Sequence, residues 1–182
     1  MPLLKIARLG HPVLRQPASP VSAKDLQTPA LQQFIDDMAD TMRDSDGVGL
    51  AAPQVHAPLR IILVEVRNLN PRYPDQPPIP LTPLVNPEIT SRGDTTEEDW
   101  EGCLSIPDLR GRVPRYTALT INALNRHGQP VTLEAKDFFA RVIQHEIDHL
   151  DGVMFLDRMK DFSTLTHLRE FQKYWLPVAT LK

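Results

Sequence analysis

The sequence predicts an α+β fold in which antiparallel β-sheets pack around one central metal-binding helix. Segments of helical periodicity do not alternate regularly with segments of strand character, which disfavours a doubly wound parallel sheet. Residues 118–135 alternate apolar and polar side chains on both sides of a turn, as an antiparallel hairpin does. With 182 residues, 41% of them hydrophobic, the chain is expected to form a single domain over residues 1–182.

An N-terminal scaffold helix is predicted to begin after Thr28, with Pro29 at its first position, and to end before Gly47. Its apolar residues recur at helical spacing: Leu31, Phe34, Ile35, Met38 and Met42. A C-terminal helix is predicted over residues 163–176, ending before Pro177 and packing over the outside of the fold. Its apolar face is formed by Leu165, Leu168, Phe171 and Trp175.

Strands are predicted at residues 59–66 and 84–89 and along both arms of the hairpin, which turns at residues 126–129. Seven of the eighteen prolines gather in residues 71–87. Because proline lacks the N–H donor that the interior of a sheet requires, this segment is predicted to be a stiff surface loop.

Charge and cysteine content restrict the class of protein. A net charge of −3 disfavours a polyanion binder, so neither DNA nor an anionic membrane surface is an expected partner. No stretch approaches 18 apolar residues and the N-terminus resembles no presequence, which predicts a soluble cytoplasmic protein, or an organelle matrix if a presequence was removed. The single cysteine, Cys103, cannot form an internal disulfide and fits a reducing compartment.

The central helix is predicted to be capped by Asp137 and to stop at Gly152, and it carries the strongest functional signal. His145 and His149 lie one turn apart on the same face, so both imidazoles can bind one cation. Glu146 stays close without having to bind. This is the pattern of a metal hydrolase, whose site usually takes three protein ligands and leaves a position for water.

The third ligand has more than one candidate. A metzincin would carry a histidine where this chain has Phe155, so that family is excluded. Glu170 on the C-terminal helix could serve as glutamate ligand in the manner of thermolysin. Cys103 is the other candidate, because it is the only thiol and it follows a glycine in a polar segment.

Three motifs resemble those of the peptide deformylases and occur in the order found in that family. They are GVGLAAPQ at residues 47–54, EGCLS at residues 101–105 and QHEIDHL at residues 144–150. Residues 9–21 and the RVPR segment at 112–115 also look like this family. The resemblance therefore covers nearly the whole chain.

The resemblance implies an enzyme that removes the formyl group from N-formylmethionyl nascent peptides and releases formate. Cys103, His145 and His149 would bind the metal, a water on the metal would attack the formyl carbon, and Glu146 would act first as base and then as acid. Fe²⁺ is the expected metal, with Zn²⁺, Ni²⁺ or Co²⁺ as substitutes, since the ligand types alone do not choose between them.

The same resemblance assigns the remaining site residues. Gln54, through its amide, and Leu104, through its backbone N–H, would hold the formyl oxygen, and Glu101 would support the site. Other expected substrate contacts are Gly47, Val48, Gly49, Leu50, Gly102, Phe138, Arg141 and Val142. The region of Gly49 would pair with the peptide as an added strand. The methionine pocket would consist of Val48, Leu104, Phe138 and Val142. Arg141 departs from the family pattern, in which an aliphatic residue is common one helical turn before the first histidine. We expect Arg141 at the mouth of this pocket, with its stem packed and its head in water.

Two other functions remain open at this level. One is a metallo-endopeptidase with Glu170 as ligand and Cys103 inert in the core. The other is a peptide-binding module with a closed, structural metal site. The basic run at residues 110–115 is expected to be a solvated loop or a contact for peptide carbonyls or ribosomal RNA, and the C-terminal helix could dock transiently on the ribosome.

Overall fold

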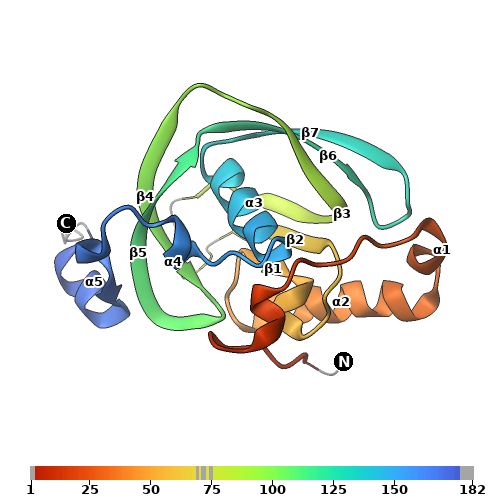
Figure 1. Ribbon diagram of the computed structural model, residues 1–182, viewed down its shortest axis with the longest axis horizontal. Helices are drawn as coiled ribbons and strands as arrows, with labels where there is room; N and C mark the ends of the chain where they lie inside the picture. The colour runs from red at the N-terminus through yellow and green to blue at the C-terminus, as the bar shows by residue number, and fades with distance from the viewer. Residues whose placement is uncertain (1–2, 69, 71–72, 74–75, 177–182) are drawn as a thin grey trace.

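The computed structural model describes residues 3–68, 70, 73 and 76–176. Helix α3 (Asp137–Leu150) lies at the centre, packed against strands of two sheets (Figure 1). The larger sheet has the order β1-β2-β3-β6-β7 and the smaller one the order β4-β5-β8. All pairings between these strands are antiparallel. The predicted α+β class is confirmed.

The strands of the larger sheet are β1 (Gly49–Ala51), β2 (Ile61–Val66), β3 (Ile79–Arg92), β6 (Ala118–Leu124) and β7 (Pro130–Lys136). The smaller sheet contains β4 (Thr96–Cys103), β5 (Ile106–Tyr116) and β8 (Thr166–His167). The predicted hairpin is β6 and β7, joined in register from Ala118 opposite Lys136 to Leu124 opposite Pro130. The EGCLS motif forms the end of β4 and the turn into β5. The sequence pattern did not reveal these two segments as strands.

Helix α2 (Pro29–Asp44) is the predicted scaffold helix, and Thr28 caps it by accepting a hydrogen bond from the N–H of Leu31. Its buried face packs with residues of β1 and β2, on the side of the larger sheet away from α3. Short helical segments complete the fold: η1 (Pro12–Arg15), α1 (Ala23–Leu26), η2 (Ala52–Val55), α4 (Phe155–Arg158) and η3 (Phe162–Thr164).

The central helix is buried along residues 140–150, so its polar residues are enclosed along with its apolar ones. Ile143, Ile147 and Leu150 belong to the core formed with the larger sheet. The polar face, which includes both histidines, turns towards β4 and β5. The helix ends at Leu150, and Gly152 follows with a φ of +73°, a conformation that favours glycine and stops the helix.

The prediction of a proline-rich loop over residues 71–87 is wrong from Ile79 onward, because β3 begins there. Residues 71–72 and 74–75 lie outside the described part of the chain. Pro80 and Pro83 fall in the part of β3 that pairs with β2 alone, and Pro87 falls where the register with β6 shifts. Proline is tolerated at a free strand edge or a bulge because no ladder donor is needed there.

The prediction of a C-terminal helix over residues 163–176 is also too long. Asp161 accepts the N–H of Ser163 in the turn η3, and residues 166–167 pair with β5 as β8. Helix α5 (Leu168–Tyr174) therefore begins only after His167, whose ring accepts the N–H of Arg169. Among the described residues, no helix combines the length and the apolar character needed to cross a bilayer.

Candidate metal centre

Three side chains from two parts of the fold converge beside α3. Cys103 comes from the end of β4, and His145 and His149 come from successive turns of the helix. Their ligand atoms all lie within 4.8 Å of one another, and the Nε2 atom of His149 is 3.3 Å from the Cys103 sulfur. All three residues are buried. One thiol and two imidazoles suit a divalent transition metal, so the donor set fits the expected cofactor.

The sulfur of Cys103 lies in surroundings that favour its thiolate. Burial alone would raise the pKa of this thiol, but the charge and hydrogen bonds of His149 and His145 lower it well below its ordinary value. The amide of Gln54 and the N–H of Ser105 each donate to the sulfur at 3.4 Å. A thiolate is the form of cysteine that binds a metal.

Glu101 fixes the orientation of the first histidine from behind the ligands. Its Oε2 atom lies 2.9 Å from Nδ1 of His145, which leaves Nε2 to face the site. Arg115 donates one hydrogen bond to each carboxylate oxygen of Glu101, at 2.8 and 3.0 Å. Burial would raise the pKa of Glu101, but the Arg115 charge and the hydrogen bonds of His145 and Arg115 lower it well below its ordinary range. Glu101 is thus an anion at neutral pH and can hold the ring of His145 in one tautomer.

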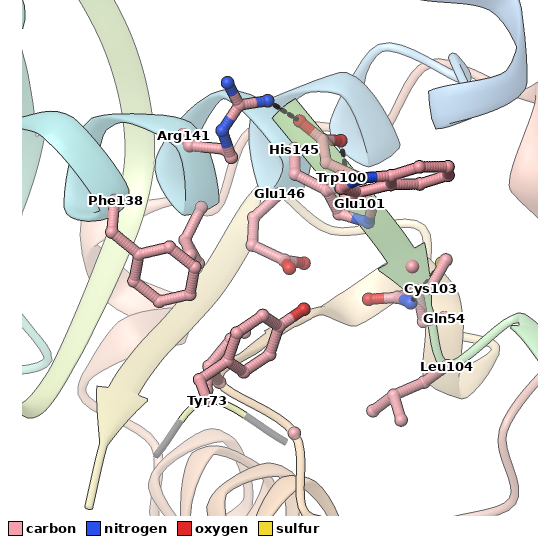
Figure 2. A pocket seen from close by; sticks show the side chains of 15 residues that line it. Gln54, Tyr73, Trp100, Glu101, Cys103, Leu104, Phe138, Arg141, His145 and Glu146 are labelled. Carbon is pink, nitrogen blue, oxygen red and sulfur yellow. Dashed lines mark hydrogen bonds and ion pairs between the residues drawn. The ribbon is translucent and has the colours of Figure 1, made fainter. Parts of the chain in front are cut away.

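Arg141 is not placed as predicted. Its guanidinium is buried, at 6% exposure for the residue, and donates to Glu101 at 3.0 Å and to the carbonyl of Val113 at 2.8 Å. A further donor reaches the carbonyl of Glu97. Figure 2 shows this side chain bound to Glu101, while Phe138 extends to another part of the pocket. The buried carboxylate and strand carbonyls supply better partners than water at the pocket mouth, so the head turns inward.

We expect Arg141→Ala to lower the free energy of unfolding by about 2–4 kcal/mol, because it strips a buried carboxylate and two carbonyls of a charged donor. Urea denaturation measures this change. The matched control is Arg112→Ala, whose partly exposed guanidinium lies 3.9 Å from Glu98 and should contribute less than about 1 kcal/mol. Equal losses in both variants would contradict the role given to the buried contacts.

Glu146 projects into the cavity beside the ligands, and its Oε2 atom is buried without a hydrogen-bond partner (Figure 2). Burial raises the pKa of this carboxyl from 4.5 to about 7, although the neighbouring histidines act in the opposite direction. A carboxyl with a pKa near neutrality can both take and return a proton at physiological pH. This places a group with acid and base capacity next to the candidate metal.

The raised pKa makes a prediction for the metal-free protein. Between pH 4.5 and 7 the folded protein keeps a proton on Glu146 that the unfolded chain has lost. Protonated Glu146 therefore contributes to the free energy of unfolding. This contribution is complete below pH 4.5 and is lost as the pH rises through 7, and the total loss is about 3 kcal/mol. Glu146→Gln should therefore gain about 3 kcal/mol relative to the parent between pH 4.5 and 7.5, measured by urea denaturation after chelation. A pH-independent difference between the two would contradict this expectation.

Gln54 is held by contacts at both ends of its amide. Its Oε1 atom accepts the N–H of Ala51 at 2.9 Å, and its Nε2 atom donates to Cys103 and, at 3.2 Å, to Ser105. The oxygen end is therefore oriented by the backbone and the donor end is aimed at the site. Leu104 follows Cys103 directly and lines the same cavity.

The cavity beside the ligands is small, with about 40 Å³ of free space. It is lined by nearly all the residues predicted to bind substrate or to act in catalysis: Gly47, Val48, Gly49, Gln54, Glu101, Gly102, Leu104, Phe138, Arg141, Val142 and Glu146. Leu50 is the exception, since it is fully buried in the core around α2. In a strand, successive side chains point to opposite faces, so Leu50 turns away from the cavity that Gly49 borders.

Gly49 permits the backbone of β1 to approach Glu146. A Cβ atom at position 49 would lie 2.3 Å from Oε1 of Glu146. We expect Gly49→Ala to displace this carboxylate. It should lower kcat/KM for the hydrolysis expected from the sequence motifs by about 10–100-fold and leave the circular dichroism spectrum unchanged. Gly93→Ala, a glycine at the distant β3–β4 turn, is the control and should keep parental activity. Full activity of the Gly49 variant would show that the close approach is dispensable.

Comparison with known proteins agrees with this geometry. The family model described as polypeptide deformylase matches residues 3–164. Peptide deformylase 1 of Prochlorococcus marinus is 44% identical over 172 residues, covering 94% of this chain and 88% of the relative. The chain belongs to the peptide deformylase family. The Met-Ala-Ser complex of class I type b peptide deformylase from Acinetobacter baumannii is 42% identical, with a TM-score of 0.84, and the match covers 87% of this chain and 99% of the other.

Several residues that contribute to the site of this deformylase chain were not singled out from the sequence. Tyr73 lies against Phe138, with ring centroids 4.9 Å apart, and Trp100 borders the same cavity. Arg115 was included in a basic run expected to be solvated, yet it is buried in β5 between Glu101 and Asp148. The sequence around Arg115 does not indicate that this arginine is buried, because its acidic partners come from distant parts of the chain.

Glu170, the other candidate third ligand, is exposed on α5 and is not part of the Cys/His/His group. Helix α5 packs chiefly against β5 and β8 rather than α3. The deformylase chain therefore places the thiol, and not this glutamate, beside the two histidines.

Proposed function

We propose that this chain removes the formyl group from the N-terminal formylmethionine of newly synthesised proteins in the cytoplasm. The convergence of Cys103, His145 and His149 on the cavity that holds Glu146 carries this proposal. The Acinetobacter baumannii relative has been captured with Met-Ala-Ser, a peptide of the kind that deformylation would release. These observations support a hydrolase acting on an N-terminal methionyl peptide.

We propose Fe²⁺ as the active metal, held by Cys103 and by Nε2 of each histidine, with Zn²⁺, Ni²⁺ or Co²⁺ as substitutes. When bound, the divalent metal would lower the pKa of a water and polarise the formyl oxygen. The buried Glu101 would keep Nε2 of His145 directed at the metal, as its contact with Nδ1 implies.

Glu146 would accept a proton from the attacking water as the new C–O bond forms at the formyl carbon. It would then deliver a proton to the amide nitrogen as the C–N bond breaks, so that the products are formate and a free methionyl amine. The burial of Glu146 in the cavity beside the candidate metal ligands supports both roles. The Gln54 amide and the Leu104 N–H would receive the negative charge that develops on the formyl oxygen.

The peptide would bind along β1. This strand is at the edge of the larger sheet, since within the described part of the chain it pairs with β2 alone, and Gly49 borders the cavity. An edge strand offers backbone donors and acceptors to an extended peptide. The methionine side chain would enter the apolar part of the cavity, formed by Val48, Leu104, Phe138 and Val142.

The test is to purify the protein anaerobically, determine its metal, and assay formate release from formyl-Met-Ala-Ser beside casein cleavage. We expect formate release and no cleavage of casein. Casein cleavage without formate release would favour the endopeptidase alternative, and a fully occupied, four-ligand metal site without either activity would favour a binding module. A transient contact of the C-terminal helix with the ribosome stays a prediction, which unchanged ribosome cosedimentation after truncation at residue 162 would contradict.

A further inference from the structure

The short helix α4 lies behind the candidate metal centre and is fixed there by close packing against β4 and β5 (Figure 1). Its residue Phe155 is buried and stacks on the ring of His145, with ring centroids 6.3 Å apart and ring planes at 22°. A Cβ atom at Gly111 of β5 would lie 2.6 Å from the sulfur of Met159, the residue that follows α4. Helix α4 is therefore a fixed base for side chains that reach the surroundings of His145.

Arg158, the last residue of α4, is connected to His145 by a continuous series of charged contacts. Its guanidinium donates to Oδ1 of Asp148 at 2.7 Å, and Arg115 donates to Oδ2 of the same carboxylate at 2.6 Å. Arg115 also donates to Glu101, whose Oε2 atom lies 2.9 Å from Nδ1 of His145. The side chains of Asp148, Arg115 and Glu101 are at most 8% exposed, whereas that of Arg158 is 50% exposed. The series thus runs from the surface to a candidate metal ligand.

Arg115 is shared between two buried carboxylates, and this sharing gives Arg158 its influence. Two nitrogens of Arg115 donate to Glu101 and the third donates to Asp148. A buried carboxylate left without a donor is costly, so Asp148 would draw Arg115 towards itself if its other donor were removed. Arg158 supplies both oxygens of Asp148, at 2.7 and 3.2 Å, and so leaves Arg115 directed at Glu101.

The oxygen of Glu101 that contacts His145 is one that Arg115 holds. The Nη2 atom of Arg115 donates to Oε2 of Glu101 at 3.0 Å. Arg141 donates to the other oxygen, Oε1, at 3.0 Å. A displacement of Arg115 would therefore loosen the atom that orients the imidazole, while the contact of Arg141 would remain.

We propose that Arg158 is a positioning residue for the metal site. It holds Asp148 so that Arg115 keeps Glu101, and with it the ring of His145, in the orientation that binds the metal. This inference rests on the metal centre of the proposed function. Within the described part of the chain, Arg158 is not among the residues that line the metal cavity, so its effect passes through the intervening side chains. A side chain at the surface would thereby set how firmly a buried metal is held.

The test measures how fast the protein loaded with Co²⁺ loses this ion to an excess of EDTA. We expect Arg158→Ala to release Co²⁺ about tenfold faster than the parent, which is the lower end of the affinity loss typical of residues that support a metal ligand. The absorption bands of the bound Co²⁺ should also change, because they depend on the arrangement of the ligand atoms. Arg158→Lys keeps the charge but loses the forked pair of donors, and it should give an intermediate rate.

Arg15→Ala is the matched control. The side chain of Arg15 is 47% exposed and pairs with Asp157, the neighbour of Arg158 on α4. This variant removes an exposed guanidinium from the same helix and leaves the series that ends at His145 intact. It should keep the parental rate of Co²⁺ release and the parental absorption spectrum.

A double-mutant cycle separates positioning from a general loosening of the fold. Glutamine at position 101 has no charge with which to hold Arg115, so Glu101→Gln interrupts the series between Arg158 and His145. In the Glu101→Gln background, Arg158→Ala should therefore change the rate of Co²⁺ release by less than about twofold. The same tenfold increase in both backgrounds would show that Arg158 acts by another route and would overturn the proposal.

The remaining outcomes separate the positioning role from the proposed function. A parent protein that binds Co²⁺, with an Arg158→Ala variant of unchanged release rate and spectrum, would overturn the positioning role and leave the deformylase proposal standing. Equal acceleration in Arg15→Ala would assign the effect to α4 as a whole and would also overturn the role of Arg158. A parent protein that binds neither Co²⁺ nor Zn²⁺ would overturn the proposed metal centre and the positioning role with it.

Discussion

Replacing Cys103 by alanine is expected to abolish metal binding and, with it, formate release. The sulfur is one of three ligand atoms within 4.8 Å of one another, and its removal leaves two imidazoles from one helix face. Loss of residues that merely support a metal ligand costs about 10–100-fold in affinity, so loss of a ligand should cost at least about 100-fold. The metal content per chain after dialysis measures the effect.

Glu170→Ala is the control for this experiment, because the endopeptidase alternative gives that residue the role of third ligand. We expect the Glu170 variant to retain a full equivalent of metal, since the side chain is exposed on α5. The circular dichroism spectrum should be unchanged in both variants. If the Cys103→Ala variant retained the metal and the Glu170→Ala variant lost it, the third ligand would be Glu170 and not Cys103.

Replacing Glu146 by glutamine is expected to leave the metal bound and to lower kcat by about 10²–10⁴-fold, the range typical of a lost general acid and base. Glutamine keeps the shape of the side chain but cannot accept a proton. The distinction from Cys103→Ala is that the metal stays. Metal analysis and initial rates of formate release from formyl-Met-Ala-Ser measure the two quantities.

Glu134→Gln provides the matched control for this substitution, as Glu134 is exposed on β7, outside the cavity. It should retain the parental kcat. A Glu146 variant with more than about a third of the parental kcat would contradict the role of this carboxylate in proton transfer.

Much of the fold and of the site was predictable because the residues that determine these features lie close together in the sequence. His145 and His149 share a face as soon as residues 137–150 form a helix, and Thr28 and Pro29 define the start of α2 by local capping. The hairpin of β6 and β7 likewise follows from alternation around a turn. Each of these features depends on neighbours within a few residues, so the pattern alone specifies it.

The errors arose where distant partners decide the structure. Arg141 turns inward because Glu101 and the carbonyls of Glu97 and Val113 lie beside it, and these come from other strands. The prolines of residues 79–87 are accommodated because β3 has a free edge at one end and a shifted register at the other. The helix predicted from residue 163 begins at Leu168 because β5 pairs with residues 166–167.

The sequence by itself determined the α+β class, the helix that presents two histidines, and the motifs that resemble peptide deformylases. Only the tertiary structure decided that Cys103 joins those histidines while Glu170 lies apart, that Glu146 is buried enough for its pKa to rise to about 7, and that α5 brings its rings to Trp100. The reason is physical: local periodicity and capping act over a few residues, whereas ligand convergence, desolvation and ring packing depend on segments far apart in the chain.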